Sequence, residues 1–496
     1  MSNILSLKNS TKPYVVTVFG ASGDLVKKKT LPCLWFLYRD SLIPRNIKII
    51  GYARSDLTID LWRQRFEKNC RVAENQKEKF EEFISKLYYF RGQYDSKENF
   101  QVLKKHIDDY SNKYSEETIR IFYLAVPPEI YVPITQHIYD VIYDKNRFID
   151  RIILEKPFGC DLESFNRLSN HLNGLFSEKA LYRIDHFLGK EMIQNLLVLR
   201  FSNLIFSPTW NKEFISSVTI SLKEDFGITG RAGYFNEAGI IRDCIQNHLL
   251  QVLTLVAMDK PSNLDSDSIR TEKVKLLNCI KPIDMKDFII GQYEGNPLSS
   301  NEDHKKGYLD EEGIPKDSLT STYALIALYI DNDKWRGVPF FIRCGKGLNE
   351  KKCEIRIQYK DNDLFNYQRA PRNELVIKIS PSEAIYMKFN FKEPKLDFSV
   401  KTTELDLTYS SRYPAHKIHD AYERLLLEVF LGSQYDFVRG DELAVAWKIF
   451  TPLLEYIDNN KIQPEKYVFG SRGPSSADSF LISRGFVYLG NYKWIN

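Results

Sequence analysis

Hydrophobic and polar positions in the first third of the chain switch repeatedly between short apolar runs and stretches with helical spacing. Tyr14–Phe19 is a run of β-branched and aromatic residues, and a helical pattern through Leu31, Leu34 and Leu37 follows it. Further apolar runs of this kind occupy residues 47–52, 86–90, 121–126 and 149–154. Strands that alternate with helices predict an α/β domain of the Rossmann type with a doubly wound parallel sheet.

The pattern changes after Lys190. Helical spacing is found at 192–201 and 239–258, with a strand-like stretch at 217–225 between them. Strand-like alternation then dominates at 320–330, 338–343, 353–359, 374–379, 384–391 and 404–409. We expect one large, mainly antiparallel sheet, with helices at 421–431 and 444–457 beside it and a surface loop at 296–317. The predicted domains are a Rossmann-like domain at 1–184 and an α+β domain at 185–496.

Two glycines, Gly20 and Gly23, stand directly after the first predicted strand and before the first helix. Glycine lets the backbone approach a pyrophosphate group, and the N–H groups that open a helix attract its negative charge. The spacing is G-x-x-G and not G-x-G-x-x-G, so an ordinary β–α turn remains an alternative. The context predicts a dinucleotide-binding loop.

The second strand is followed by Arg54, at the place where an NAD enzyme carries an acidic residue for the ribose hydroxyl groups. A guanidinium group there favours the 2′-phosphate of NADP, which its planar fork can bind in a bidentate manner. The alternative is an arginine that is only solvated. Arg54 therefore predicts NADP as the cofactor.

The segment 182–190 combines unlike chemistries at the end of an apolar run. Asp185, His186 and Lys190 fall within six positions, and Lys156 follows the preceding strand, held extended by Pro157. Open α/β sheets bind their ligands at the carboxyl ends of their strands. We therefore expect an active site here, close to the domain boundary.

Composition limits the classes of partner. The 496 residues include 69 Lys and Arg against 65 Asp and Glu, a net charge of +4, which gives no basic field for nucleic acid. Seven scattered cysteines without a Cys-x-x-Cys pair are typical of reduced thiols. No signal peptide and no apolar run long enough for a membrane span is found. A cytoplasmic protein that binds neither membrane nor nucleic acid is expected.

Histidine is the side chain whose ordinary pKa, about 6.5, suits a general base near neutral pH. Six of the eight histidines lie in polar or loop contexts, which leaves His186 and His248. Cys244 and His248 have metal-ligand spacing, but no further ligand accompanies them, so no metal is expected. On an ideal α-helix Asp243 and His248 would be about 140° apart, able to border one cleft but not to stack on one line. A buried core histidine is the alternative for His248.

Four motifs, at 20–25, 155–159, 183–190 and 239–248, resemble those of the glucose-6-phosphate dehydrogenases of eukaryotic type, and the likeness covers nearly the whole chain. This resemblance implies oxidation of D-glucose 6-phosphate at C1 to 6-phospho-D-glucono-1,5-lactone, with hydride transfer to NADP. That reaction is the first oxidative step of the pentose phosphate pathway. It also implies a homodimer or homotetramer.

The resemblance assigns roles to residues. His248 is implied as the base, Asp185 as the group that orients it, and Lys156 as a lysine that reaches both nicotinamide and sugar. Substrate-binding residues are implied to be Lys156, His186, Lys190, Glu224, Asp243, Lys346 and Lys351. Cofactor-binding residues are implied to be Gly20, Ser22, Gly23, Asp24, Leu25, Arg54, Tyr131 and Lys156.

The same resemblance implies a second, structural NADP in the carboxy-terminal domain. Its residues would be Lys352, Arg356, Lys378, Tyr386, Lys388, Asp406, Arg472, Tyr488 and Trp494. The chain departs from its relatives in four places: Phe187 replaces a Tyr, Lys351 and Lys378 each replace an Arg of vertebrate members, and Ser380 replaces a Gln. These departures bear on affinity more than on mechanism.

Two alternatives remain open from the sequence. Sugar oxidoreductases of the glucose-fructose oxidoreductase and inositol dehydrogenase type also carry Glu-Lys-Pro after a Rossmann strand, but they are shorter and lack the run at 183–190. A catalytically silent NADP-binding regulatory protein would keep the fold, and the presence of Asp185, His248 and Lys156 argues against it. An endoplasmic-reticulum relative would need a signal peptide and an additional lactonase domain.

Overall fold

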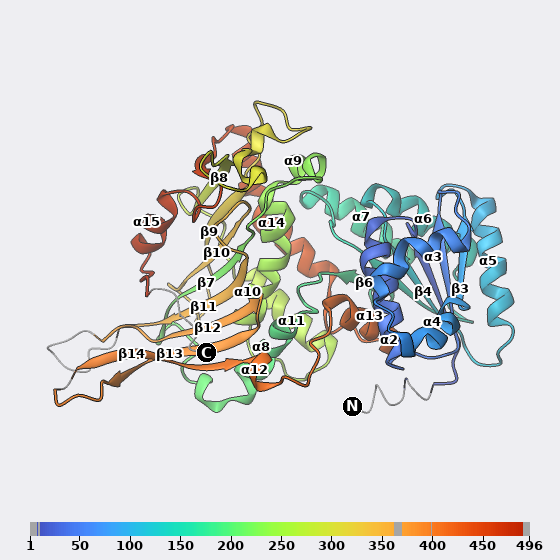
Figure 1. Ribbon diagram of the computed structural model, residues 1–496, viewed down its shortest axis with the longest axis horizontal. Helices are drawn as coiled ribbons and strands as arrows, with labels where there is room; N and C mark the ends of the chain where they lie inside the picture. The colour runs from blue at the N-terminus through green and yellow to red at the C-terminus, as the bar shows by residue number, and fades with distance from the viewer. Residues whose placement is uncertain (1–6, 8–9, 362–369, 398, 490–496) are drawn as a thin grey trace. The chain divides into compact units, whose positions relative to one another are not determined.

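The computed structural model describes residues 7, 10–361, 370–397 and 399–489 (Figure 1). The chain divides into two compact units. The first comprises Met1–Gly189, Asn263–Arg270 and His419–Ala444, and the second comprises Lys190–Ser262, Thr271–Ile418 and Val445–Asn496. The predicted domain bounds are 1–184 and 185–496. The structure instead adds two later segments to the first unit, because these segments contact the sheet and helices formed by residues far earlier in the sequence.

The first unit is built on a seven-stranded sheet in the order β15-β6-β5-β4-β1-β2-β3. Its strands are β1 Tyr14–Phe19, β2 Ile47–Ala53, β3 Leu87–Arg91, β4 Ile119–Leu124, β5 Ile149–Leu154, β6 Leu181–Ile184 and β15 Phe437–Val438. All neighbours pair in parallel except β15, which pairs with β6 antiparallel. The two central strands β1 and β4 are buried along their whole length, as expected for a parallel sheet covered on both faces.

Three of the helices between these strands begin at polar N-caps. The side chains of Thr58, Ser96 and Asp161 each accept a backbone N–H in the first turn of the helix that follows. The helices of this unit are α2 Leu31–Arg39, α3 Ile59–Glu67, α4 Lys77–Ile84, α5 Lys97–Ser111, α6 Tyr131–His137, α7 Leu162–Leu175 and α13 Ala421–Leu431. The Rossmann-like prediction for this half is confirmed.

The second unit holds a nine-stranded sheet in the order β14-β13-β12-β11-β7-β10-β9-β8-β16. Its strands are β7 Ile215–Lys223, β8 Phe288–Glu294, β9 Tyr323–Tyr329, β10 Pro339–Gly345, β11 Lys352–Tyr359, β12 Glu374–Ser380, β13 Ala384–Lys392, β14 Val400–Thr408 and β16 Glu465–Val468. The prediction of a mainly antiparallel sheet is confirmed, with parallel pairing only for β10 with β7 and β16 with β8 among the described residues.

Helices of this unit are α8 Glu191–Ser202, α9 Ala232–Ile240, α10 Leu250–Ala257, α12 Tyr409–Arg412 and α15 Ser476–Ser483, while α11 Ser266–Asn278 and α14 Gly440–Asn459 run from one unit into the other. The predicted helix at 239–258 is not one regular helix. The backbone breaks at Gly239, with φ 64° and ψ 171°, and Ile241–Leu249 is a π-helix. Within 296–317, the predicted loop contains two short 3-10 turns, Glu302–Lys305 and Tyr308–Asp310.

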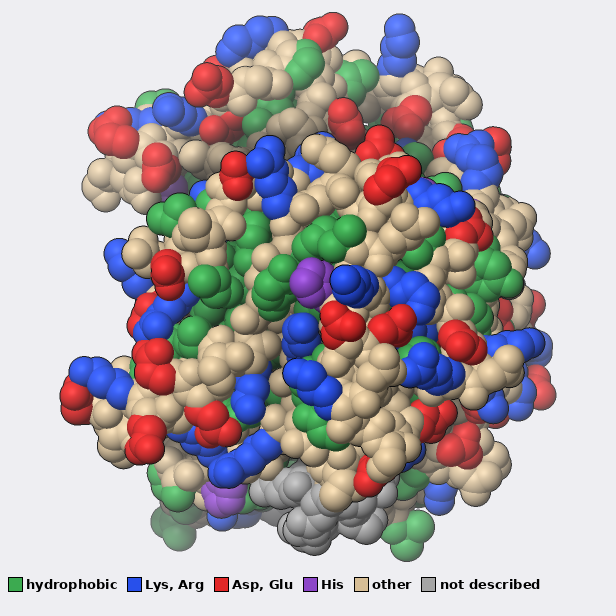
Figure 2. All heavy atoms as spheres, turned by 90° about the vertical axis from the view of Figure 1, so that its right-hand side faces the viewer, with side chains coloured by type: hydrophobic (Ala, Val, Ile, Leu, Met, Phe, Trp, Pro, Cys, Tyr) green, Lys and Arg blue, Asp and Glu red, His purple; other side chains and the backbone are tan. Residues whose placement is uncertain are grey.

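No helix in the described part of the chain combines the length and the apolar character that crossing a membrane requires. The face drawn in Figure 2 mixes acidic and basic side chains, with apolar side chains between them. Such a mixed face offers no single-sign field of the kind that attracts a polyanion.

Candidate functional site

The glycine loop of the first unit is a turn that only glycine fits. Gly20 has φ +78°, and a Cβ atom there would lie 2.1 Å from the carbonyl oxygen of Ala125. The Gly20 N–H donates to the carbonyl of Tyr52 at 2.9 Å, and the Gly23 N–H donates to the carbonyl of Gly20. The tip of β1 is thus fixed against β2 and β4, with the loop at the carboxyl end of the strand.

Side chains around this loop come from two strands. The Ser55 hydroxyl donates to the Ser22 hydroxyl at 3.0 Å, which connects the glycine loop to the end of β2. Arg54 is exposed, and its guanidinium carbon lies 5.5 Å from the ring centroid of Tyr94. Asp24 is exposed and pairs with Lys28 at 2.6 Å, and Leu25 precedes the π-helical turn Val26–Thr30. Arg54 is therefore at the place where the sequence predicts the ribose end of the cofactor.

The end of β5 is held by tyrosines. The Tyr131 hydroxyl donates to the carbonyl of Glu155 at 2.7 Å and accepts the N–H of the same residue at 3.1 Å. Tyr131 is completely buried. The next peptide bond, Lys156–Pro157, is cis. The side chain predicted to contact the cofactor therefore supports the backbone directly before Lys156.

Glu155 itself is a buried carboxyl group that the sequence analysis did not single out. Tyr123 donates to its Oε1 at 2.5 Å, and the Tyr422 hydroxyl lies 3.5 Å from its Oε2. Burial raises the pKa of Glu155 to about 7, although these hydroxyl groups and Lys156 act to lower it. Tyr422 comes from α13, so only the folded chain brings this group together.

Asp185 and His186 follow β6, as predicted. Asp185 is buried, and its Oδ1 accepts the N–H of Phe187 at 3.0 Å. The ring of His186 is parallel to that of Tyr422, with 6.0 Å between centroids and 9° between planes. Phe187 is buried, and its ring centroid lies 5.3 Å from that of His186. The histidine ring is therefore flanked by two aromatic side chains.

In the second unit, Lys346 at the end of β10 lies among carboxylates. Its Nζ is 2.5 Å from Glu224 Oε2 and 3.8 Å from Asp243 Oδ2. Burial acts to lower the pKa of Lys346, but the charge of Glu224 and its other neighbours raises the pKa above its ordinary value. Lys346 and Asp243 are buried together. This cluster brings together three of the predicted substrate residues and offers both donors and acceptors to a polyhydroxylated ligand.

The π-helix carries Asp243, Cys244 and His248, all buried. Because backbone hydrogen bonds in a π-helix join residues five apart and not four, its turn is wider, and His248 lies closer to the face of Asp243 than it would in an α-helix. The sequence-based expectation of about 140° between them holds for an ideal α-helix, and the chain forms a π-helix here instead. The Cys244 thiol contacts that of Cys344 on β10, where burial raises the pKa of Cys344 well above its ordinary value. Cys244 thus packs against the sheet.

Two further predicted residues lie in the second unit. Lys190 is the N-cap of α8, with an extended backbone, and Lys351 is exposed directly before β11. The predicted set is therefore divided, with Asp185, His186 and Lys156 in the first unit and the remaining substrate and base residues in the second.

Two protein-family models match this chain. The model described as "Glucose-6-phosphate dehydrogenase, NAD binding domain" matches residues 17–195, and the model described as "Glucose-6-phosphate dehydrogenase, C-terminal domain" matches residues 197–494. The chain belongs to the glucose-6-phosphate dehydrogenase family. It is therefore an oxidoreductase with a domain for a nicotinamide cofactor.

Individual proteins that are similar to this chain carry the name of the same family. The chain is 52% identical over 486 residues to a glucose-6-phosphate 1-dehydrogenase of Caenorhabditis elegans, with 97% of this chain and 93% of the relative covered. The corresponding protein of Dictyostelium discoideum is 48% identical, with 99% and 98% covered. A solved structure of a glucose-6-phosphate dehydrogenase in complex with its substrate glucose 6-phosphate is similar with a TM-score of 0.92 at 46% identity, covering 97% of this chain and 99% of that one.

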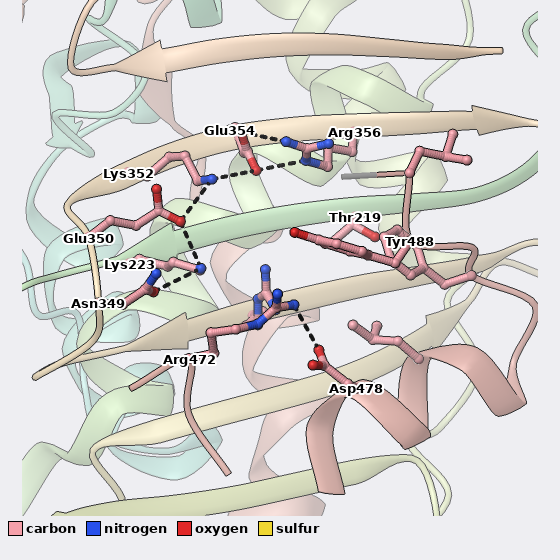
Figure 3. Close-up of a pocket in the computed structure, with 14 residues that line it drawn as sticks. Thr219, Lys223, Asn349, Glu350, Lys352, Glu354, Arg356, Arg472, Asp478 and Tyr488 are labelled. Atoms are coloured by element: carbon pink, nitrogen blue, oxygen red, sulfur yellow. Dashed lines mark hydrogen bonds and ion pairs between the residues drawn. The ribbon is translucent and has the colours of Figure 1, made fainter. Parts of the chain in front are cut away.

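A pocket in the second unit of this dehydrogenase-family chain contains four of the residues predicted for a second NADP: Lys352, Arg356, Arg472 and Tyr488 (Figure 3). Its empty volume, including the open mouth, is about 550 Å³. The pocket does not include Lys378, Tyr386, Lys388 or Asp406. Trp494 lies outside the described residues.

Carboxylates connect the cations of this pocket. Glu350 pairs with Lys223 at 3.0 Å and with Lys352 at 2.9 Å, and Glu354 pairs with Arg356 at 2.8 Å (Figure 3). Glu374 pairs with Arg356 at 2.9 Å and with Lys388 at 3.1 Å, which links Lys388 to the network from outside the pocket. Arg472 pairs with Asp478 and lies over the ring of Tyr488.

This pocket is also lined by residues that were not predicted from the sequence, among them Thr219, Lys223, Arg343 and Glu350. The sequence carries only part of the signal for two of them, Thr219 and Lys223. Lys352, Glu354 and Arg356 alternate along β11 and so point to one face of the sheet, and register pairs β11 with β7, which carries Thr219 and Lys223. The pairing itself cannot be seen in the sequence.

Proposed function

We propose that this chain oxidises D-glucose 6-phosphate at C1 to 6-phospho-D-glucono-1,5-lactone, with NADP as the hydride acceptor. The family match supports the reaction class, and the similar solved structure carries glucose 6-phosphate. The single observation that carries the proposal for the substrate is the cluster of the buried Lys346 and Asp243 with the half-buried Glu224. Its fixed donors and acceptors suit sugar hydroxyl groups.

His248 acts as the general base in this proposal. It takes the proton from the C1 hydroxyl group while the C1 hydrogen leaves as hydride, so that the C–O bond becomes a carbonyl bond. Asp185 orients the imidazole and stabilises the imidazolium that forms, in the manner of a carboxylate–histidine pair. Lys156 holds the sugar beside the nicotinamide. The cofactor, when bound, supplies the carbon that accepts the hydride.

The remaining predicted residues bind the substrate or the cofactor in this proposal. Glu224 and Asp243 hold sugar hydroxyl groups. His186 binds the phosphate, Lys190 and Lys346 bind the phosphate and neighbouring oxygens, and Lys351 is a further substrate-binding residue. The cofactor residues are Gly20, Ser22, Gly23, Asp24, Leu25, Arg54 and Tyr131. The fit of the loop is supported by Gly20, whose turn leaves no space for a Cβ atom, and Tyr131 acts through the backbone of Glu155.

The test is nicotinamide reduction with glucose 6-phosphate, followed with NADP and separately with NAD. Replacing the base in His248→Asn should lower kcat by several orders of magnitude and leave NADP binding near normal, because a lost base acts on the transition state. His416→Asn, at an exposed histidine, is the matched control. Near-normal turnover of His248→Asn would contradict the assignment.

We also propose a second, non-reacting NADP in the pocket around Arg356 and Arg472. Cations there suit phosphate groups, and Tyr488 offers a flat ring for stacking. A homodimer or homotetramer in the cytoplasm completes the proposal, on the basis of the resemblance alone. Sedimentation velocity at micromolar concentration measures the oligomeric state, and a monomer at every concentration would contradict it.

A further inference from the structure

We propose that Asn247 is a positioning residue for the reaction, which keeps His248 and Asp243 on one face of their helix. This inference rests on the proposed function, in which His248 is the base. The Asn247 side chain makes two bonds to the backbone of the π-helix. Its Nδ2 donates to the carbonyl oxygen of Arg242 at 3.0 Å, and its Oδ1 accepts the N–H of His248 at 2.6 Å.

π-Helical turns are rare compared with α-helical turns. The wide turn in this helix therefore needs local interactions that stabilise it. Asparagine competes with regular secondary structure by bonding to nearby backbone groups. Asn247 does so at both ends of one wide turn, since Arg242 is five residues before it and His248 directly follows it. Its amide group therefore favours the wide turn over the α-helical one.

The width of the turn decides where the functional side chains lie. Residues 243 and 248 are about 140° apart around an α-helix, and the wider turn of the π-helix brings them closer to one face. Asp243 is buried and faces Lys346, with 3.8 Å between Oδ2 and Nζ. A return to α-helical spacing would turn either Asp243 away from Lys346 or His248 away from the face that it now shares with Asp243.

The start of this helix is fixed independently of Asn247. The backbone breaks at Gly239, with φ 64° and ψ 171°, and the Ile240 N–H donates to the carbonyl of Ser321 at 3.1 Å. With this end held, a change in the width of the turn must appear further along, at His248. The structure thus assigns Asn247 a role that acts through its neighbour and not by contact with substrate.

The experiment compares Asn247→Ala with Asn203→Ala, which removes a similar side-chain bond, from Asn203 Nδ2 to the carbonyl of Leu199, at the end of α8. We expect kcat of Asn247→Ala to fall at least tenfold with NADP affinity unchanged. With glucose 6-phosphate deuterated at C1, the isotope effect on kcat/KM should rise, because a displaced base makes hydride transfer slower relative to binding. A loss of folded protein alone would lower kcat and leave the isotope effect and KM unchanged.

The outcomes separate this inference from the proposed function. Wild-type kcat and isotope effect in Asn247→Ala, together with an inactive His248→Asn, overturn the role of Asn247 only. An active His248→Asn overturns the proposed function. If Asn247→Ala does not fold, Asn247→Asp replaces it, because a carboxylate still accepts the His248 N–H but cannot donate to Arg242. An intermediate kcat with a raised isotope effect is then expected, and wild-type values would overturn the inference.

Discussion

At the scale of single residues, Glu155 is the least expected feature of the first unit. It is buried directly before Lys156, and burial raises its pKa to about 7 from an ordinary 4.5. A folded state that holds a proton more tightly than the unfolded state is stabilised at low pH, and that stability is lost as pH rises from about 4.5 through about 7. The charge of Glu155 therefore costs folding free energy at pH 8.

The corresponding prediction is that Glu155→Gln stabilises the protein at pH 8, by at most about 3 kcal/mol at 1.36 kcal/mol per pKa unit. The gain should shrink toward pH 4.5, where the carboxyl group becomes neutral in the unfolded state as well as in the folded state. Urea unfolding across this range measures it, with Glu78→Gln at an exposed position as the control. An equal gain at pH 5 and pH 8 would show that the effect is not electrostatic.

Arg54 permits a test of cofactor choice. If its guanidinium group binds the 2′-phosphate, Arg54→Ala should weaken NADP binding by about 1.5–3 kcal/mol, the range for hydrogen bonds to charged groups, and leave NAD nearly unaffected. Binding of both cofactors is measured by titration. Arg65→Ala, on the exposed side of α3, is the control. An unchanged ratio of the two affinities would make Arg54 an ordinary surface residue.

At the scale of elements, the glycine turn between β1 and the following helix is the most constrained. In Gly20→Ala the added Cβ would collide with the carbonyl oxygen of Ala125, so the turn must move. Gly230 also has a positive φ, +79°, but nothing lies within 4 Å of its Cβ position, so Gly230→Ala costs only the backbone strain, about 1 kcal/mol. We expect Gly20→Ala to lose most of its NADP affinity, measured by titration, and Gly230→Ala to keep it. Equal affinity in both variants would contradict a role for this turn.

The helices and strands differ in how well the sequence predicts them. The apolar runs predicted β1, β2, β4 and β5 within two residues, because buried parallel strands are continuously hydrophobic. The pattern did not predict β8, which is interrupted by Gly291, nor the π-helix, because periodicity over nine residues does not separate it from an α-helix. The motifs supplied the candidate residues. The buried environment of Glu155, by contrast, depends on Tyr422 from α13, and this contact cannot be seen in the sequence.

At the scale of the whole molecule, ligand binding should appear as thermal stability. A ligand that binds only the folded protein stabilises it by mass action, by about 2.7 kcal/mol at a hundred times its Kd. If the second pocket binds NADP, cofactor at a concentration below the Kd of the weakened first site should still raise Tm in Arg54→Ala. The double variant Arg54→Ala with Arg472→Ala should lose this rise, because Arg472 lines the pocket.

The pH dependence of that stabilisation gives a second signature. Burial lowers the pKa of Lys223 to about 8, in spite of its pairing with Glu350, so Lys223 is a cation at pH 7 and mostly neutral at pH 9. Since a cation favours phosphate, NADP should raise the Tm of Arg54→Ala more at pH 7 than at pH 9. Arg54→Ala combined with Arg336→Ala, at an arginine outside this pocket, is the control and should behave as Arg54→Ala alone. If NADP protects the wild-type protein but gives no protection to Arg54→Ala at either pH, all of the stabilisation comes from the first site and the second site is absent.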